Sequence, residues 1–310
     1  MTILLLEPIH EEAHSLLADH DRTVLAENAD ELEQTVTHEK IIAILTRGRG
    51  QISAALMQRC PSLRVVARCG VGLDNVDLHT AQQREVAVIY APGSTTAAVA
   101  EHTLMLTLAA ARKLHPIATA VNEDDWQARN NYRGIELTGK SIGIVGLGEI
   151  GRRVAELAHA FGMHVLTWSR TSRDSRYEAL SLDALLERAD IVSLHTALTP
   201  ATHHLIGARE LALMKPGALL INTARGGLID QLALGEAVER GIIGGFAADV
   251  LDPEPPAASE RLLRNPRVLV TPHIAALTDV TYRTMCLRTV TNVLAVLRGD
   301  QPEQKSVYHV

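Results

Sequence analysis

The sequence predicts an α/β protein built from two Rossmann-like domains, each with a parallel sheet covered by helices. Hydrophobic residues make up 46% of the chain and aromatic residues only 3%, which indicates aliphatic cores like those of helix-covered parallel sheets. Short aliphatic runs alternate with amphipathic segments in two separate series. At roughly 100 to 200 residues per domain, the 310 residues are enough for two domains.

The first series fills the N-terminal part of the chain. Helices are expected from Pro8 and near Ser53, between short aliphatic runs that are typical of buried parallel strands. The expected strands cover residues 3–6, 41–45, 63–67 and 86–90. A turn-forming segment at 92–96 interrupts the pattern, and residues 99–112 then predict a long helix that is apolar on most faces and therefore buried.

The second series begins after this helix. Helices are expected from Glu149, over residues 182–188 and from Asp230. The expected strands cover residues 141–145, 164–168, 191–194, 218–221 and 245–248. Strands that alternate with helices at this spacing imply right-handed crossovers and an open parallel sheet. A final helix is expected over residues 278–298, and it is long enough to return to the first domain.

A glycine-rich turn follows the first strand of the second series. The turn has the pattern G-x-G-x-x-G, with an apolar strand before it, a helix after it and a second strand at βαβ spacing. In such a turn Gly146 permits the tight bend, Gly148 lets the backbone approach a pyrophosphate, and Gly151 allows close packing of helix and strand. The helix N-terminus adds amides and a partial positive charge. The sequence therefore predicts dinucleotide binding here.

Composition and charge exclude several classes of protein. The 30 Lys and Arg residues against 36 Asp and Glu residues give a net charge of -6 without a long basic run, so no nucleic-acid partner is expected. The longest apolar stretch, around residues 103–111, is about half of a membrane span, and the first residues lack the basic flank of a signal peptide. Cys60, Cys69 and Cys286 are widely spaced, which indicates reduced thiols in a cytoplasmic protein.

One motif resembles a zinc site. His10, Glu11 and His14 match the pattern H-E-x-x-H, and Glu31 and Glu33 follow at a distance that would suit a third ligand. On a helical wheel, however, the two histidines lie at the solvent edge of an apolar stripe. A solvated helix face is the preferred interpretation, and no metal is predicted.

Several dispersed motifs together resemble the D-isomer-specific 2-hydroxyacid dehydrogenase family, over essentially the whole chain. They occur in the order expected for that family, at residues 68–77, 99–102, 146–151, 222–226, 249–250 with 254–256, and 271–274. Two departures stand out. Ala197 occupies a position where proline is usual, and Ala275 and Ala276 replace a smaller pair after His273. The first concerns the rigidity of a loop beside the cofactor, and the second concerns the substrate pocket or the hinge.

The resemblance implies a particular division of the chain. Residues 1–98 and 275–310 are expected to form the substrate domain, and residues 99–274 an inserted dinucleotide-binding domain. It also implies a homodimer with the helix at 99–112 in the interface, because an exposed apolar helix would otherwise be a liability.

The resemblance also assigns catalytic and substrate-binding residues. His273 is the expected acid/base group, since an imidazole titrates near pH 7, and Glu254 is expected to hold its tautomer. Arg225 offers a planar fork for the carboxylate and carbonyl oxygens of the substrate. Further substrate contacts are expected from Arg47 and from the backbone around Gly70, Val71 and Gly72, whose amides can cradle a carboxylate.

The expected cofactor-binding residues lie on the second series of elements. Asp249 is expected, by resemblance, to contact the nicotinamide carboxamide. The full expected set is Gly146, Leu147, Gly148, Glu149, Ile150, Gly151, Ser169, Arg170, Thr171, His195, Thr196, Thr223, Ala224 and Asp249.

The residues after the second strand of this series favour NADP over NAD. An NAD site in this fold ends that strand with a carboxylate that binds the adenosine ribose and would repel a 2'-phosphate. Ser169 occupies this position, 18 residues after Gly151, and Arg170 follows it. Serine and arginine can both bind a phosphate, with NAD as the alternative.

The function that these features favour is hydride transfer between a nicotinamide cofactor and a small 2-oxo acid or D-2-hydroxy acid. Arg47 lies in a loop that faces the distal anionic group of the substrate in phosphoglycerate dehydrogenases, which makes 3-phosphoglycerate or another substrate with two anionic groups a candidate. Glyoxylate and hydroxypyruvate are equally open. A non-catalytic dinucleotide sensor or corepressor is the alternative, since fold alone does not fix function. Oxidation of formate or phosphite on the same scaffold is a third, weaker possibility.

Overall fold

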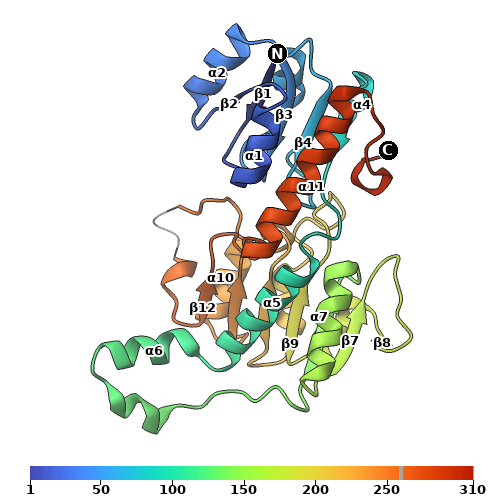
Figure 1. The fold of residues 1–310 in the computed structure, drawn as a ribbon. Coiled ribbons are helices and arrows are strands. Elements are labelled where there is room, and N and C mark those ends of the chain that lie inside the picture. Colours follow the sequence, from blue (N-terminus) through green and yellow to red (C-terminus); the bar gives the residue numbers. More distant parts are fainter. Residues whose placement is uncertain (258–260, 310) are drawn as a thin grey trace. The chain divides into compact units, whose positions relative to one another are not determined.

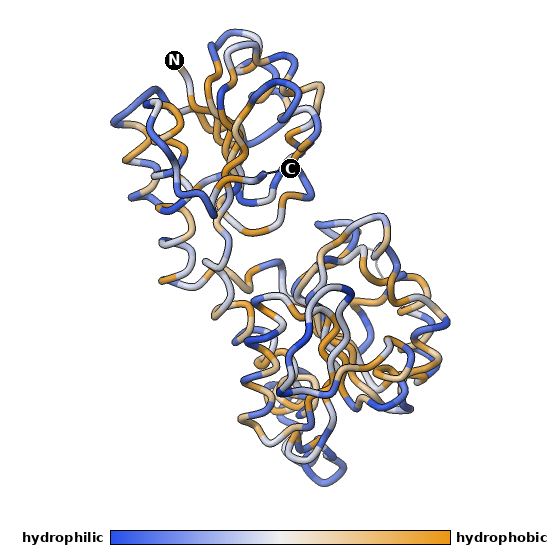
Figure 2. The backbone as a smooth tube through the Cα atoms, turned by 90° about the vertical axis from the view of Figure 1, so that its right-hand side faces the viewer, coloured by the Kyte–Doolittle hydropathy of each residue, from blue (hydrophilic) through white to orange (hydrophobic). Residues whose placement is uncertain are grey.

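The computed structural model describes residues 1–257 and 261–309. The chain divides into two compact units. Unit 1 contains residues 1–95 and 277–310, and unit 2 contains residues 96–276. These divisions fall at 95/96 and 276/277, and the sequence placed its domain boundaries at 98/99 and 274/275. Figure 2 shows that hydrophobic segments gather in the middle of each unit and that hydrophilic segments lie around them.

Unit 1 is built on a five-stranded parallel sheet with the order β2-β1-β3-β4-β5. Its strands are β1 (Thr2–Leu5), β2 (Arg22–Leu25), β3 (Ile41–Thr46), β4 (Val65–Arg68) and β5 (Ala87–Ile89). Its helices are α1 (Glu11–Ala18), α2 (Ala29–His38), α3 (Ala54–Gln58), α4 (Leu78–Gln83) and α11 (Asp279–Arg298), with a short 3-10 helix η4 (Gln304–Ser306).

The two faces of this sheet have separate cores because neighbouring side chains of a strand point to opposite sides. Ile3 and Leu5 pack with residues of α1 and α11. Leu4, in contrast, packs with residues of α2, α3 and α4. The final helix, α11, therefore covers the sheet of unit 1, where it contacts α1, β4 and β5.

Unit 2 is built on a seven-stranded parallel sheet with the order β12-β11-β10-β9-β6-β7-β8. Its strands are β6 (Ser141–Val145), β7 (His164–Trp168), β8 (Glu178–Ala179), β9 (Ile191–Leu194), β10 (Leu219–Asn222), β11 (Gly245–Ala248) and β12 (Val268–Val270). Its helices are α5 (Thr96–Ala111), α6 (Leu114–Asn122), α7 (Glu149–Ala160), α8 (Leu182–Arg188), α9 (Ala208–Leu213) and α10 (Gln231–Glu239), with 3-10 helices η1 (Trp126–Asn131), η2 (Gly226–Leu228) and η3 (Leu262–Arg264). Helices α5 and α7 share a core with one face of the sheet, and α8, α9 and α10 share one with the other.

These two parallel sheets confirm the predicted fold class. The long apolar helix of the prediction is α5, which begins at Thr96, three residues earlier than expected. The prediction omitted the short edge strands β2, β8 and β12, of which β8 is exposed and the other two are partly buried. It also omitted α2, α4 and α9, and α6, whose residues are all at least partly exposed and which extends away from the sheet of unit 2 (Figure 1). Strands of two to four residues are too short to show a clear hydrophobic alternation, so sequence patterns detect them poorly.

None of the helices in the described residues is long and apolar enough to span a membrane. Cys60, Cys69 and Cys286 are all buried and free, as expected for reduced thiols.

Candidate active site

The glycine-rich turn lies where the strand order of unit 2 reverses. Strand β6 pairs with β7 on one side and with β9 on the other, so the carboxyl end of β6 is the topological switch point at which open α/β sheets bind ligands. The turn leads directly from β6 into the N-terminus of α7, whose N-cap residue is Gly148.

Each glycine of the turn has a separate steric reason. Gly146 has a φ of 104°, and a Cβ atom there would lie 2.6 Å from the carbonyl group of His195. A Cβ atom at Gly151 would lie 2.0 Å from the carbonyl oxygen of Gly146. At Gly148, by contrast, a Cβ atom would meet no heavy atom within 4 Å. Gly146 and Gly151 are needed for packing. Gly148, in contrast, leaves an open approach to the amides of α7, as a bound pyrophosphate requires.

The loop after β7 carries the residues that the sequence assigned to the adenosine end of the cofactor. Ser169 Oγ accepts a hydrogen bond from the Ser172 amide at 3.2 Å. The Arg173 guanidinium donates to the carbonyl oxygens of Ser169 and Ser172. Arg170 and Thr171 are exposed. The loop is thus closed on itself, and its exposed rim is cationic.

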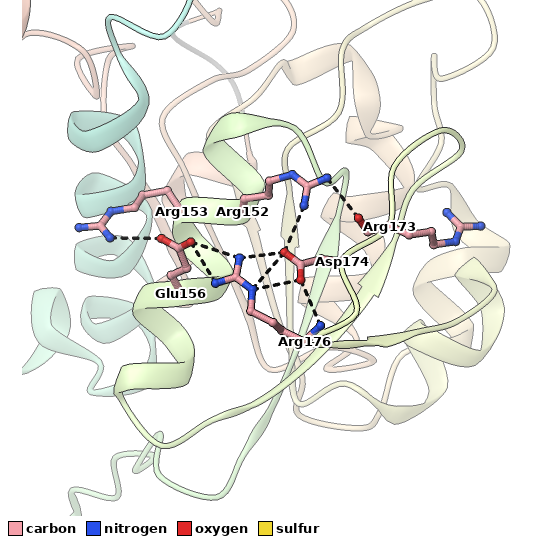
Figure 3. Close-up of polar contacts among 6 residues, drawn as sticks. All are labelled: Arg152, Arg153, Glu156, Arg173, Asp174 and Arg176. Carbon is pink, nitrogen blue, oxygen red and sulfur yellow. Dashed lines mark hydrogen bonds and ion pairs between the residues drawn. The ribbon is translucent and has the colours of Figure 1, made fainter.

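Asp174 is the first carboxylate after β7, and two arginines neutralise it (Figure 3). Its carboxylate lies 3.1 Å from the Arg152 guanidinium, which extends from α7, and 2.8 Å from that of Arg176. Arg176 also contacts Glu156 of α7 at 3.2 Å. The hydrogen bonds from Arg176 hold the pKa of Asp174 far below its ordinary value. This carboxylate therefore fastens the loop to α7.

The predicted catalytic residues come together in unit 2. His273 Nδ1 lies 2.7 Å from Glu254 Oε2, although 18 residues separate the two in sequence. Burial would raise the pKa of Glu254, but the hydrogen bond from His273, the Leu251 amide and the nearby charge of Arg225 outweigh it and lower that pKa. An ionised Glu254 accepts the proton of Nδ1, so Nε2 is the ring nitrogen that this contact leaves available, and the acid/base role of His273 stays a prediction.

The side chain of Asn222, the last residue of β10, holds the backbone of Arg225. Asn222 Nδ2 donates to the Arg225 carbonyl oxygen at 2.8 Å, and the Ala224 amide donates to Asn222 Oδ1 at 3.0 Å. A Cβ atom at the next residue, Gly226, would lie 2.0 Å from the carbonyl carbon of Leu251. The close approach of these two segments brings Arg225 and Glu254 into electrostatic contact.

Asp249 supports the segment that carries His273. The side chain is 1% exposed, and its two oxygens accept hydrogen bonds from the amides of Ile274 and Ala275 and from the hydroxyl of Thr271. His102 Nε2 lies 2.9 Å from the same hydroxyl. His273 itself has a φ of 56°, in the left-handed region that few side chains adopt. Asp249 therefore orders the His273 backbone, and its contact with a nicotinamide stays a prediction.

The other predicted cofactor residues follow β9 and β10. His195 Nε2 lies 2.8 Å from Ser193 Oγ, and burial lowers the pKa of His195 to about 3. Thr223 Oγ1 lies 2.8 Å from Thr103 Oγ1 of α5. Thr196 and Ala224 are partly exposed. The carbonyl oxygen of Ala197 accepts a hydrogen bond from Thr202 Oγ1 at 2.7 Å, which orders this loop where the family has a proline.

The predicted substrate residues lie in unit 1, at the carboxyl ends of β3 and β4. Arg47 follows β3, and its guanidinium lies 3.0 Å from the Glu7 carboxylate and 5.4 Å from the ring centre of Tyr282. Gly70, Val71 and Gly72 follow β4. The buried Arg68 side chain donates to the carbonyl oxygens of Arg47 and Gly72, and so ties the two loops together.

Glu7 is a residue of this region that the sequence analysis missed. Burial would raise its pKa, but the Arg49 amide and the Arg47 charge outweigh burial and lower it. The available signal was its position, since Glu7 is a carboxylate immediately after the buried run that ends at Leu6. Such a group needs buried partners.

The two histidines of the zinc-like motif contact other groups of unit 1. His10 caps the N-terminus of α1 by accepting from the Glu12 amide, and His14 Nε2 contacts the Thr23 hydroxyl at 3.1 Å. Residues 1–257 and 261–309 contain no cluster of His, Cys, Asp and Glu side chains that is suited to a metal ion. His14 is exposed and His10 is partly exposed.

Comparisons with known proteins agree with these features. The family profile described as "D-isomer specific 2-hydroxyacid dehydrogenase, NAD binding domain" matches residues 104–275. A D-3-phosphoglycerate dehydrogenase of Archaeoglobus fulgidus is 37% identical over 90% of this chain. The match covers 54% of the relative's length, so this chain spans about half of that protein. A hydroxypyruvate reductase of Thermotoga maritima is 35% identical over 90% of the chain and 95% of its own length.

Solved structures extend the similarity to the whole fold. The crystal structure of the TT0316 protein of Thermus thermophilus superposes with a TM-score of 0.91 at 38% identity, and the match covers 100% of both chains. The order of motifs, the glycine-rich turn at the switch point and these matches together lead to one conclusion. The chain belongs to the D-isomer-specific 2-hydroxyacid dehydrogenase family.

Proposed function

We propose that this protein is a reductase that transfers a hydride from a nicotinamide cofactor, NADP in preference to NAD, to a small 2-oxo acid, and that it catalyses the reverse reaction on the D-2-hydroxy acid. The contact of 2.7 Å between His273 and Glu254, in the unit that carries the glycine-rich turn, is the observation that supports this most strongly. It provides a proton donor in the same unit as the predicted dinucleotide site, and reduction of a carbonyl group requires such a donor.

Each chemical requirement of the reaction has a residue in this proposal. When bound, a reduced nicotinamide would supply the hydride for the carbonyl carbon of the substrate. His273 Nε2 donates the proton that the carbonyl oxygen takes up, and Glu254 stabilises the imidazolium before that transfer. Arg225 binds the carboxylate and the carbonyl oxygen, which places the substrate for both transfers.

The preference for NADP rests on the loop after β7. Ser169 and Arg170 offer a hydroxyl and an exposed guanidinium where an NAD site has a carboxylate. The first carboxylate of that segment, Asp174, is paired with Arg152 and Arg176, so its charge does not oppose a phosphate. Gly146 to Gly151 would hold the pyrophosphate, with His195, Thr196, Thr223, Ala224 and Asp249 along the remainder of the cofactor.

The proposed substrates have the chemistry of those that the relatives' names indicate. Hydroxypyruvate, glyoxylate and 3-phosphoglycerate share a carboxylate beside a carbonyl or hydroxyl group. Arg225 is the proposed ligand of that carboxylate in unit 2. In unit 1, the amides around Gly70, Val71 and Gly72 are candidate anion contacts. In unit 1, Arg47 is the candidate contact for the distal end of the substrate. The buried free thiols support a cytoplasmic enzyme.

A screen of 2-oxo acids with NADPH and NADH tests the proposal. We expect turnover of at least one small 2-oxo acid, with kcat/KM at least about tenfold higher for NADPH than for NADH, which corresponds to about 1.4 kcal/mol. In Ser169→Asp/Arg170→Ala most of this preference should disappear. A parent protein that prefers NADH overturns the cofactor assignment, and tight NADPH binding without turnover of any 2-oxo acid indicates a sensor or corepressor instead.

A further inference from the structure

An arginine in the first turn of α7 holds the loop that follows β7. Arg152 comes directly after Gly151 of the glycine-rich turn, and its guanidinium lies 3.1 Å from the Asp174 carboxylate (Figure 3). The other terminal nitrogen of the same guanidinium donates to the Arg173 carbonyl oxygen at 3.3 Å. Arg152 therefore binds a side chain and a backbone group of one loop, and two contacts from a planar fork fix position better than one.

Further contacts carry this attachment through the loop. Asp174, whose side chain is 9% exposed, also accepts from the Arg176 amide at 3.1 Å and from the Arg176 guanidinium at 2.8 Å. Toward the other end of the loop, the Arg173 guanidinium donates to the Ser169 carbonyl oxygen, and the Ser172 amide donates to Ser169 Oγ at 3.2 Å. A continuous set of contacts thus joins α7 to Ser169, the first residue after β7.

The charges of this region are compensated on the side of α7 and remain open on the exposed rim of the loop. Carboxylates and guanidinium groups meet at 2.8 to 3.3 Å in a cluster of Asp174, Glu156, Arg152, Arg153 and Arg176. The partners of Arg173, in contrast, are neutral carbonyl oxygens, and Arg170 is exposed. The rim therefore keeps positive charge, which suits a phosphate group.

The position of this rim relative to the glycine-rich turn matters for the choice of cofactor. NADPH differs from NADH only by a phosphate on the adenosine ribose, and in this fold the residues after the second strand meet that ribose. The turn at the start of α7 would hold the pyrophosphate that both cofactors share. Because Arg152 joins α7 to the loop, its contact with Asp174 sets the distance between the two binding regions.

We propose that Arg152 and Asp174 form a specificity-determining positioning pair, which holds Ser169 and Arg170 where they bind the additional phosphate of NADPH. The pair thereby sets how strongly the protein discriminates between NADPH and NADH. This inference rests on the cofactor preference proposed above and deepens it. All four residues belong to unit 2. The pair acts through the position of the loop and not through its own charges, which compensate each other.

The test compares the dissociation constants of NADPH and NADH for the parent, Arg152→Gln and Asp174→Asn, by fluorescence titration of the full chain. One variant removes a cation and the other an anion, but both break the same contact. We expect both to lower the preference for NADPH about 3- to 10-fold, the scale of the cost of ordering one or two side chains on binding. An effect of charge alone would instead make Asp174→Asn prefer NADPH more strongly.

Two more variants serve as controls. The double variant Arg152→Gln/Asp174→Asn should lose little more preference than the more affected single variant, because the contact is already broken there. Arg209→Gln breaks a matched pair with Asp183, which joins α9 to α8 at 3.0 Å, and should leave the preference unchanged. Asp174 keeps its contact with Arg176 in Arg152→Gln, so this variant is expected to fold. Both constants come from one preparation, so a loss of stability cancels in their ratio.

The outcomes separate this inference from the proposed function. A preference for NADPH that either single variant leaves unchanged or raises, or losses that add up in the double variant, overturn the positioning role and leave the cofactor assignment intact. A parent that binds NADH more tightly than NADPH overturns the cofactor assignment, and this inference with it. A parent that binds neither cofactor overturns the proposed function itself.

Discussion

At the scale of single residues, the proposed chemistry depends on the two carboxylates that position His273. Glu254 orients His273 through Nδ1, and Asp249 fixes the backbone beside it through the amides of Ile274 and Ala275. His273 adopts a strained left-handed backbone conformation, which persists only where the surroundings enforce it. His273 is thus held in place from two sides, by one carboxylate at its ring and another at its backbone.

Replacement of this imidazole tests the assignment directly. We predict that His273→Asn keeps the dissociation constant for NADPH and lowers kcat by roughly 10²- to 10⁴-fold, the usual contribution of a positioned acid/base group. Stopped-flow kinetics under single-turnover conditions would measure the chemical step. A variant whose single-turnover rate equals that of the parent removes His273 from the mechanism.

At the scale of elements, the junction of β6 and α7 combines two different demands on glycine. Gly151 has no side chain and therefore lets the Gly146 carbonyl group pack closely against it. Gly148 faces open space at the helix N-terminus. The same helix is fastened to the loop after β7 through the pairing of Arg152 with Asp174. The loop after β7 and the glycine-rich turn are therefore both attached to α7.

The two glycines give a matched pair of variants. Gly151→Ala should lower the free energy of unfolding by about 1 to 3 kcal/mol, because the added methyl group overpacks a site without space. Gly148→Ala should leave the stability nearly unchanged and weaken NADPH binding. Thermal unfolding and a fluorescence titration of NADPH measure the two effects. Equal losses of stability in both variants would contradict the separation of packing from binding.

At the scale of the whole molecule, unit 2 exposes a surface that suits a second copy of this chain. Leu114 and Val121 of α6 and Trp126 of η1 are 55%, 47% and 63% exposed. Beside α6, the side chains of Leu104, Met105, Leu108, Leu157 and Phe161 line an apolar hollow on α5 and α7. Exposed apolar surface of this kind is typical of protein interfaces, and the homodimer expected from the sequence stays a prediction.

Disruption of this surface should produce monomers. We predict that the parent elutes with the mass of a dimer and that Leu114→Asp/Trp126→Asp elutes as a folded monomer, because two carboxylates cannot be buried without partners. Light scattering coupled to size exclusion measures the mass. A monomeric parent, or a dimeric double variant, argues against an interface at this face.

Acid should destabilise the protein in two ranges of pH. The native pKa values of Glu7 and Asp190 are lowered. At these two carboxyl groups, the unfolded chain therefore binds more protons than the native protein only when the pH falls to their ordinary pKa values, near pH 4. Burial lowers the pKa of native His195 to about 3. The unfolded chain therefore begins to bind more protons than the native protein at this residue near pH 6.5. The free energy of unfolding should therefore fall as the pH drops from 6.5 to 4.5, by no more than about 1.4 kcal/mol per pH unit. Denaturant titrations at several pH values test this, and His195→Gln should flatten the slope in that range.

The sequence by itself determined the fold class, the glycine-rich turn and the lack of a carboxylate at Ser169. These features are local, because hydrophobic periodicity and turn chemistry are properties of a few neighbouring residues. It predicted His273, Glu254 and Arg225 only through a resemblance, and no local pattern could show that the first two meet at 2.7 Å. Edge strands such as β2 and the exposed helix α6 escaped detection for lack of a buried face.

Only the tertiary structure decided the environment of Arg47. The sequence shows a cation in a loop, but Glu7 reaches it from 40 residues away because parallel pairing sets β1 beside β3 and brings their carboxyl ends together. Likewise, the strand order places β6 between β7 and β9, which turns a glycine motif into a site at the switch point. Charge compensation acts over a few ångströms in space, and distance along the chain carries no information about it.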